Sequence, residues 1–167
     1  MDLLIRPVRL DDAEEVARIL NAAIADGRYT VLDTPLSVEA EREFIASFPQ
    51  RGVFHVAECR PGGRIVGFQD VSPFATYTTA FDHVGVIGTF VDLDWRGQGI
   101  GRRLSEATIA AAVAKGYEKL FTYVRADNPA ALAFYQAMGF RLVGTAQRQA
   151  KINGRYVDEV FIERFLV

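Results

Sequence analysis

One short stretch of the chain combines glycines with arginines: it reads Arg-Gly-Gln-Gly-Ile-Gly-Arg-Arg from Arg96 to Arg103. Glycines lack Cβ atoms and let main-chain amides come close to a ligand. Amides at the start of a helix attract anions, and a guanidinium group can pair with phosphate through two hydrogen bonds. The stretch therefore predicts a pyrophosphate site, although glycine content alone fits a solvated turn equally well.

The two commonest phosphate-binding motifs do not fit this stretch. A P-loop needs Lys and then Ser or Thr directly after its second glycine, and the chain has no such run. The dinucleotide fingerprint is G-x-G-x-x-G after an early strand, whereas Gly97, Gly99 and Gly101 form G-x-G-x-G in mid-chain. Neither a P-loop nor a dinucleotide fold is favoured.

The elements around the stretch are predicted from hydrophobic period and turn residues. Strand-like segments cover 3–10, 53–59, 65–71, 82–92, 120–124, 140–145 and 157–166. Helical periodicity covers about 11–26, 38–48, 99–115 and 129–138, with Asp11, Ser37 and Asn128 as N-cap candidates. The hairpin linker 60–63 favours antiparallel pairing of the second and third strands. We expect one domain over residues 1–167.

Composition limits the classes of function. Half of the residues are hydrophobic, and Lys plus Arg number 19 against 21 Asp plus Glu, a net charge of −2. This balance gives no reason to expect a nucleic-acid or membrane partner, and it favours a small molecule. The single cysteine, Cys59, forms no intrachain disulfide, and no long apolar run occurs. We expect a cytoplasmic protein, with exposed strands and aromatics making a homodimer plausible.

These motifs resemble the GNAT acetyltransferase superfamily, whose acetyl-CoA loop reads Arg or Gln, two residues, Gly, one residue, then Gly or Ala. Arg96, Gly99 and Gly101 fit that loop, and Asn128 with Tyr135 fits the later Asn and the Tyr seven residues on. Phosphinothricin acetyltransferases and bacterial L-amino-acid N-acetyltransferases are the most similar subgroups. The resemblance implies an α+β fold with α/β-like layers: a mixed, mostly antiparallel sheet of about seven strands, flanked by about four helices.

The resemblance also implies a cosubstrate, acetyl-CoA, and no metal. The main chain of the strand before the loop would hold the pantetheine arm, the loop amides the pyrophosphate, and a backbone N–H near Val91 the oxyanion. The residues implied in acetyl-CoA binding are Phe90, Val91, Arg96, Gly97, Gln98, Gly99, Ile100, Gly101, Arg102 and Asn128.

Proton transfer needs an acid and a base. The resemblance implies Tyr135 as the general acid, since a phenol of pKa ~10 suits a thiolate leaving group; a core tyrosine is the alternative. The phosphinothricin subgroup commonly has a Glu where this chain has Val86. A base must then come from elsewhere, or a water chain or an already neutral amine must suffice. The candidates are Asp82, His83, Asp158 and Glu159, with His83 the best matched in intrinsic pKa.

The acceptor is expected between three variable segments, 27–35, 72–81 and 147–156, with Tyr29, Phe74 and Tyr77 as lining residues. Packing of these aromatics beneath the loops is the alternative. Tyr77 stands where phosphinothricin enzymes have an Arg able to hold an acidic substrate. The expected activity is transfer of an acetyl group to a small amine, such as an amino acid or an analogue of one. A protein or peptide N-acetyltransferase and a non-catalytic acyl-CoA sensor are the alternatives.

Overall fold

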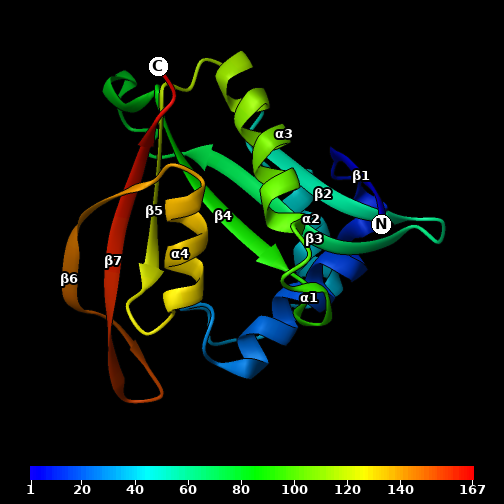
Figure 1. Cartoon of the computed structure of the whole chain (residues 1–167), viewed down its shortest axis with the longest axis horizontal. Coiled ribbons are helices and arrows are strands. Elements are labelled where there is room, and N and C mark those ends of the chain that lie inside the picture. Colours follow the sequence, from blue (N-terminus) through cyan, green and yellow to red (C-terminus); the bar gives the residue numbers. More distant parts are fainter.

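One seven-stranded sheet with helices on both faces forms the molecule, as the computed structural model describes for residues 1–167 (Figure 1). The strand order is β1-β2-β3-β4-β5-β7-β6, and only the β4–β5 pair is parallel. The expected mixed, mostly antiparallel sheet with four α-helices is confirmed. In chain order the elements are β1 (Asp2–Pro7), α1 (Ala13–Asp26), α2 (Val38–Ala46), β2 (Val53–Arg60), β3 (Arg64–Pro73), β4 (Val84–Val91), α3 (Ile100–Ala114), β5 (Lys119–Arg125), α4 (Pro129–Ala137), β6 (Arg141–Ile152) and β7 (Arg155–Phe165).

Local signals set most helix ends. Ser37 caps α2, because its hydroxyl accepts a hydrogen bond from Ala40 N at 3.1 Å. Gly27 ends α1 in the left-handed region with φ of 80°. The start of α1 differs from the prediction, because a short 3₁₀ turn precedes it and Asp12, not Asp11, is the N-cap residue. The Asp12 carboxylate accepts the Arg9 amide at 2.7 Å and makes no capping bond to an amide of α1. The cap therefore lies one residue later than the sequence pattern indicated.

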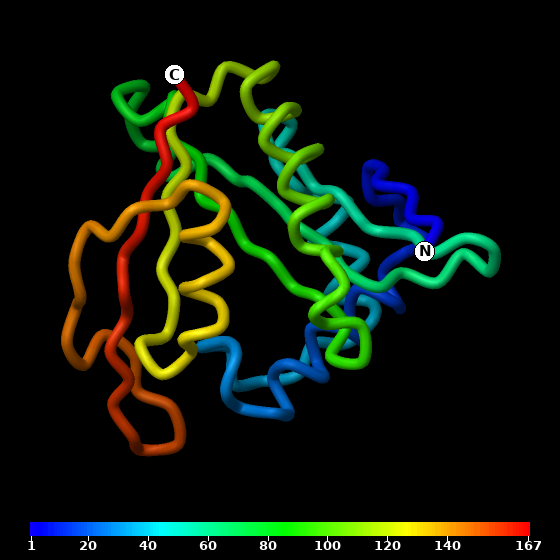
Figure 2. Tube along the Cα trace, viewed as in Figure 1, coloured from blue at the N-terminus to red at the C-terminus, as the bar shows by residue number.

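Helices α3 and α4 cover one face of the sheet, and α1 and α2 cover the opposite face over β2 to β4 (Figures 1 and 2). Residues Val16, Ile19 and Leu20 of α1 pack against β2 and β3 on one side. Leu104 of α3 and Tyr135 of α4 lie in the cores on the other side. The face of β5 and β7 opposite α4 has no helix over it.

Strands β4 and β5 separate towards their C-terminal ends. They pair only where Val84 to Val86 faces Lys119 to Phe121, and beyond that point the two strands diverge (Figure 1). The resulting gap splits the sheet into two halves and opens next to the glycine loop that follows β4. The candidate functional site lies at this gap.

The β3–β4 register decides which main-chain groups face the gap. Phe74 N donates to Val84 O, and Asp92 N donates to Val66 O, so the even-numbered residues of β4 bond to β3. The amides and carbonyls of Thr89 and Val91 must then face the gap, where β5 no longer pairs. They form a free strand edge inside the molecule.

The C-terminal hairpin is longer than predicted. Strand β6 continues to Ile152, past the expected end at Thr145, because a bulge at Ala146–Ala150 with Arg148 at φ of 54° lets pairing with β7 resume. No helix is both long and apolar enough to cross a membrane.

Candidate active site

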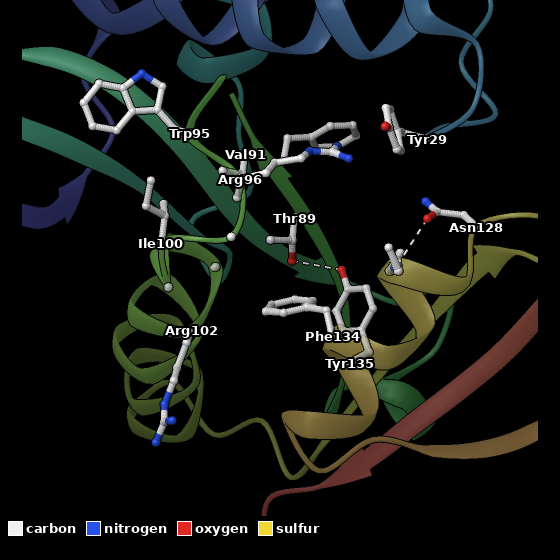
Figure 3. A pocket seen from close by; sticks show the side chains of 16 residues that line it. Tyr29, Thr89, Val91, Trp95, Arg96, Ile100, Arg102, Asn128, Phe134 and Tyr135 are labelled. Atoms are coloured by element: carbon white, nitrogen blue, oxygen red, sulfur yellow. Dashed lines mark hydrogen bonds between the residues drawn. The ribbon is translucent and has the colours of Figure 1, made fainter. Parts of the chain in front are cut away.

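A pocket of about 340 Å³ lies between the end of β4 and the N-termini of α3 and α4 (Figure 3). Nine of the ten residues expected to bind acetyl-CoA line it, and Gln98 does not. Its lining consists of Tyr29, Thr89, Phe90, Val91, Trp95, Arg96, Gly97, Gly99, Ile100, Gly101, Arg102, Asn128, Ala130, Ala131, Phe134 and Tyr135.

Geometry explains in two different ways why the loop has glycine at these positions. Gly97 and Gly99 have φ of 73° and 78°, and a Cβ on either would meet no atom within 4 Å. Their backbone needs glycine, and the space beside them is open to a ligand. Gly101 instead packs against a ring, because a Cβ there would lie 2.9 Å from Phe134. Ile100, 1% exposed, anchors the start of α3 in the core.

The three arginines of the stretch lie in different places. Arg96 stacks on the ring of Tyr29, with its guanidinium carbon 3.7 Å from the ring centroid. Arg102 is exposed and pairs with Glu106 at 3.2 Å. Arg103 donates to Leu3 O at 2.7 Å, on the far side from the pocket lining. Only Arg96 and Arg102 therefore remain beside the loop to meet an anion.

Asn128 begins α4 and faces the pocket at the same time. Its Oδ1 accepts from Ala131 N at 3.2 Å, the expected N-cap bond, and the residue is 7% exposed (Figure 3). The Nδ2 group makes no hydrogen bond within the chain, so it is a free donor at the pocket wall.

Tyr135 reaches the pocket from α4. Its hydroxyl lies 2.9 Å from Thr89 Oγ1, which also accepts from Gln69 Nε2 at 2.8 Å (Figure 3). Burial raises the pKa of Tyr135 to about 12; the Thr89 hydrogen bond opposes this rise and the charge of Asp70 adds to it. The hydroxyl is protonated at neutral pH, as a proton donor requires, but it is a weaker acid than a free phenol.

Tyr135 is also a core residue, which was the alternative interpretation of its place in the sequence. The ring of Tyr135 packs edge-on against Phe140 at 5.2 Å within the core, while its hydroxyl reaches the pocket. Packing fixes the ring, and the hydroxyl is left available for chemistry.

A second hollow, of about 440 Å³, lies over β5 and β7 on the opposite face of the sheet. Each of the three segments expected to enclose the acceptor contributes to it, through Val31, Phe74 and Gln149. We call it the aromatic hollow; it is lined by Val31, Phe74, Phe121, Tyr123, Gln149, Ala150, Glu159 and Phe161.

Glu159 is the only charged residue that lines the aromatic hollow. It is 2% exposed, its Oε2 has no hydrogen-bond partner, and burial raises its pKa despite the nearby charge of Arg125. Arg125 itself is occupied, because it donates to Gly27 O and Thr30 O in the loop after α1. The hollow therefore offers aromatic rings and a carboxyl group but no cation.

Several expected site residues lie elsewhere. His83 and Asp82 precede β4 at its other end, far from Thr89 and Tyr135, so neither can serve an amine in the gap. Tyr77 is 82% exposed and lines neither cavity. Tyr29, expected beside the acceptor, lies in the first pocket under Arg96.

The structure changes which residues of β4 can offer main-chain groups to a ligand. Phe90 bonds to β3 through its main chain and stacks on Phe68 at 5.1 Å, so Thr89 and Val91 are the residues with free main-chain groups. Thr89 was not singled out by the sequence, because a threonine in a strand is ordinary; only its pairing with Gln69 and its contact with Tyr135 mark it.

Residues 17–140 match the acetyltransferase (GNAT) family. The chain belongs to this family. Among its relatives, N-alpha-acetyltransferase RimI of Mycobacterium tuberculosis is 38% identical over 101 residues, which are 60% of this chain and 60% of that protein. Phosphinothricin N-acetyltransferase of Streptomyces coelicolor is 24% identical over 168 residues, covering 98% of this chain and 96% of that protein.

Solved structures agree on the GNAT fold. The phosphinothricin acetyltransferase of Sinorhizobium meliloti, solved in complex with acetyl-CoA, superposes with a TM-score of 0.90. Its sequence is 23% identical, and the match covers 99% of this chain and 89% of that one. In the present GNAT protein, no group of three or more His, Cys, Asp or Glu side chains could hold a metal ion.

Proposed function

We propose that this GNAT protein transfers the acetyl group of acetyl-CoA to the amine of a small molecule. The observation that carries the proposal is the first pocket, where an open glycine loop, the free edge of β4 and a protonated tyrosine meet. Each part offers a different kind of donor, and acetyl-CoA has a matching acceptor for each.

The fit can be followed along the pocket. The amides from Gly97 to Arg102 suit a diphosphate at the positive end of α3. The free edge at Thr89 and Val91, with Asn128 Nδ2 opposite, suits the amide groups of a pantetheine arm laid like an added strand. When bound, the thioester supplies an activated acyl carbon beside Tyr135.

The acceptor would come from the other face of the sheet, through the aromatic hollow. Phe121 is the last β5 residue paired with β4, and Tyr123 follows where the gap has opened. Aromatic walls without a cation favour a small amine with an apolar or aromatic body over an acidic one. The S. coelicolor relative is named for a small-molecule acceptor, which supports this size class.

Turnover with defined acceptors tests the activity directly. The protein is incubated with acetyl-CoA and a panel of small amines, and release of the CoA thiol is followed; aromatic and aliphatic amines should give release above blank. A panel of peptides forms the second arm, because the M. tuberculosis relative is named an N-alpha-acetyltransferase. Turnover of peptides alone would favour a peptide acceptor, and no turnover with either panel would contradict transferase activity.

A glycine pair tests the pyrophosphate assignment. Gly99 and Gly116 both have positive φ and open space at Cβ, but Gly116 follows α3 at its other end. Replacing either by Ala should cost stability by about 1–2 kcal/mol. Only Gly99→Ala should weaken CoA binding, by about tenfold or more in calorimetry, because its methyl enters the ligand's space. Equal CoA affinities in the two variants would remove the loop from the binding site.

Two further expectations belong with this proposal: a cytoplasmic location and a homodimer. Leu142 and Val143 are 52% and 53% exposed on the edge strand β6, which leaves apolar surface for a second copy away from the aromatic hollow. Sedimentation equilibrium would distinguish monomer from dimer.

A further inference from the structure

Asp70 lies on β3, with β4 between it and the gap, on the same face of the sheet as the aromatic hollow. It pairs with Gly88 of β4, and the even-numbered residues of both strands share the face that carries Phe74 and Phe90. Gly88 has no side chain to cover the strand at this point. A Cβ built there would lie 3.7 Å from Asp70 Oδ1 and would meet no other atom within 4 Å. The carboxyl group of Asp70 therefore borders the open space above Gly88.

The carboxyl group of Asp70 has no hydrogen bond and no ion pair within the chain. Two titratable groups interact with it through their charge: Glu41, which is 3% exposed on α2, and Tyr135 on α4, which lies on the opposite face of the sheet. Burial, with a contribution from the charge of Glu41, raises the pKa of Asp70 to about 7. An unpartnered carboxyl group is costly to keep, and this one titrates where a general base works best.

The other carboxylates expected from the sequence are placed less well. Asp82 is at the wrong end of β4, and Asp158 accepts the Arg148 amide at 2.8 Å. Glu159 belongs to β7, on the far side of β5 from β4. Val86 stands where the phosphinothricin subgroup commonly has a Glu. It lies on the same face as Asp70 and diagonal to it across the β3–β4 pair. Asp70 can therefore supply a carboxylate to this part of the site from the neighbouring strand.

We propose that Asp70 is the catalytic base, which takes the proton from the attacking amine; this inference rests on the proposed function. As the C–N bond forms, Asp70 accepts a proton from nitrogen. As the C–S bond breaks, Tyr135 gives its proton to sulfur. Exchange with solvent then returns a proton to Tyr135 and removes one from Asp70. The net reaction converts a neutral amine and a thioester into an amide and a thiol.

The two residues are coupled through the gap. The negative charge of Asp70 contributes to the raised pKa of Tyr135. Protonation of Asp70 by the amine removes this charge and lowers the pKa of Tyr135 at the step where sulfur needs a proton. Proton uptake by Asp70 therefore favours the later proton transfer from Tyr135, although the two residues lie on opposite faces of the sheet.

The test is Asp70→Asn, assayed with an arylamine that is neutral throughout the pH range of the measurement. For the wild type, log(kcat/KM) should rise with pH and level off above an apparent pKa near 7. The variant should lose about 10²-fold or more at the plateau and lose the rising limb. Its CoA affinity by calorimetry should equal that of the wild type, because Asp70 does not line the CoA pocket.

Stability gives a readout independent of turnover. A carboxyl group whose pKa is raised by folding destabilises the fold once it ionises. The melting temperature of Asp70→Asn should therefore match that of the wild type well below pH 4 and exceed it increasingly as the pH rises towards 8. A purely structural Asp70 would instead give a less stable variant.

Two more variants complete the design. Asp82→Asn, at an exposed carboxylate that lines neither cavity, should keep the wild-type rate and pH profile. Glu159→Gln tests the rival carboxylate. The proposal is overturned if Asp70→Asn keeps the rising limb, or if the limb disappears only in Glu159→Gln. Failure of the wild type to bind any CoA species would instead overturn the proposed function.

Discussion

A single hydrogen bond links the edge of β4 to Tyr135, the proposed proton donor. Thr89 Oγ1 accepts from Gln69, which also donates to Ser105 Oγ at 2.9 Å, and it lies 2.9 Å from the Tyr135 hydroxyl. With Gln69 donating, the threonine proton is free to point at the tyrosine oxygen and leave the phenolic proton for the pocket. The chain of contacts therefore orients the acid and also lowers its pKa.

Two substitutions test this link. Thr89→Val keeps the shape but removes the hydrogen bond, so the pKa of Tyr135 should rise further and kcat should fall about fivefold, as expected for about 1 kcal/mol. Tyr135→Phe removes the donor and should lower kcat by about 10²-fold or more. Both are measured by CoA release at saturating acetyl-CoA. A protein that only senses acyl-CoA would bind CoA in all three forms and show no activity for either change to lower.

At the scale of elements, the residue that begins α4 combines a helix cap with a free hydrogen-bond donor at the pocket wall. Asn128 caps the helix with its oxygen and presents its nitrogen to the pocket. An amide side chain carries its acceptor and its donors on two different atoms, so one atom can cap the helix while the other faces the pocket. Ser37, by contrast, caps α2 on the exposed surface and lines neither cavity.

The two roles of Asn128 can be separated. Asn128→Asp keeps a capping oxygen and should leave the melting temperature close to that of the wild type. It replaces the donor by an anion, so the CoA dissociation constant should rise at least tenfold. Ser37→Ala is the converse control: it should lose about 1 kcal/mol of stability with CoA affinity unchanged. An Asn128→Asp protein with full affinity would show that the side chain serves the helix alone.

The elements themselves could be predicted from the sequence because their signals are local. Ser37, Gly27 and the Asn128-Pro129 pair set helix ends through contacts with nearby residues. The glycine loop was also found, since three glycines between a strand and a helix leave a local pattern. Strand β6 was underestimated because its second half is polar and continues through a bulge, which has no periodic signal.

Site residues that depend on register could not be predicted in the same way. The roles of Thr89 and Asp70 follow from which β3 residue faces which β4 residue and from where β5 stops pairing. His83 was an attractive base by intrinsic pKa, but its distance from the gap depends on the length of β4. Tyr29 was predicted beside the acceptor but lines the first pocket, because its ring stacks with Arg96 of the glycine loop.

For the whole molecule, the gap that creates the site also divides the sheet. The two halves share one short parallel joint, at Val84 to Val86 and Lys119 to Phe121, and the loop after α1 meets the second half through Arg125. The first pocket, where we propose that CoA binds, is lined by residues of both halves, such as Gly99 from one and Asn128 from the other. A bound CoA would therefore tie the halves together and stabilise the fold by an amount set by its concentration and affinity.

The joint itself depends on Gly85. A Cβ there would lie 2.6 Å from Val71 Cγ1 and 3.1 Å from Leu120 Cδ2, so a methyl group would push β3 and β5 away from β4. Gly85→Ala should therefore lower the free energy of unfolding by about 1–3 kcal/mol in urea titrations, the usual cost of overpacking. Gly144→Ala, on β6 with open space at Cβ, should leave it unchanged. If CoA binds in the first pocket, it contacts both halves but not this joint, so saturating CoA should raise the melting temperatures of both variants. A Gly85→Ala protein that is as stable as Gly144→Ala would mean that the halves are held together elsewhere.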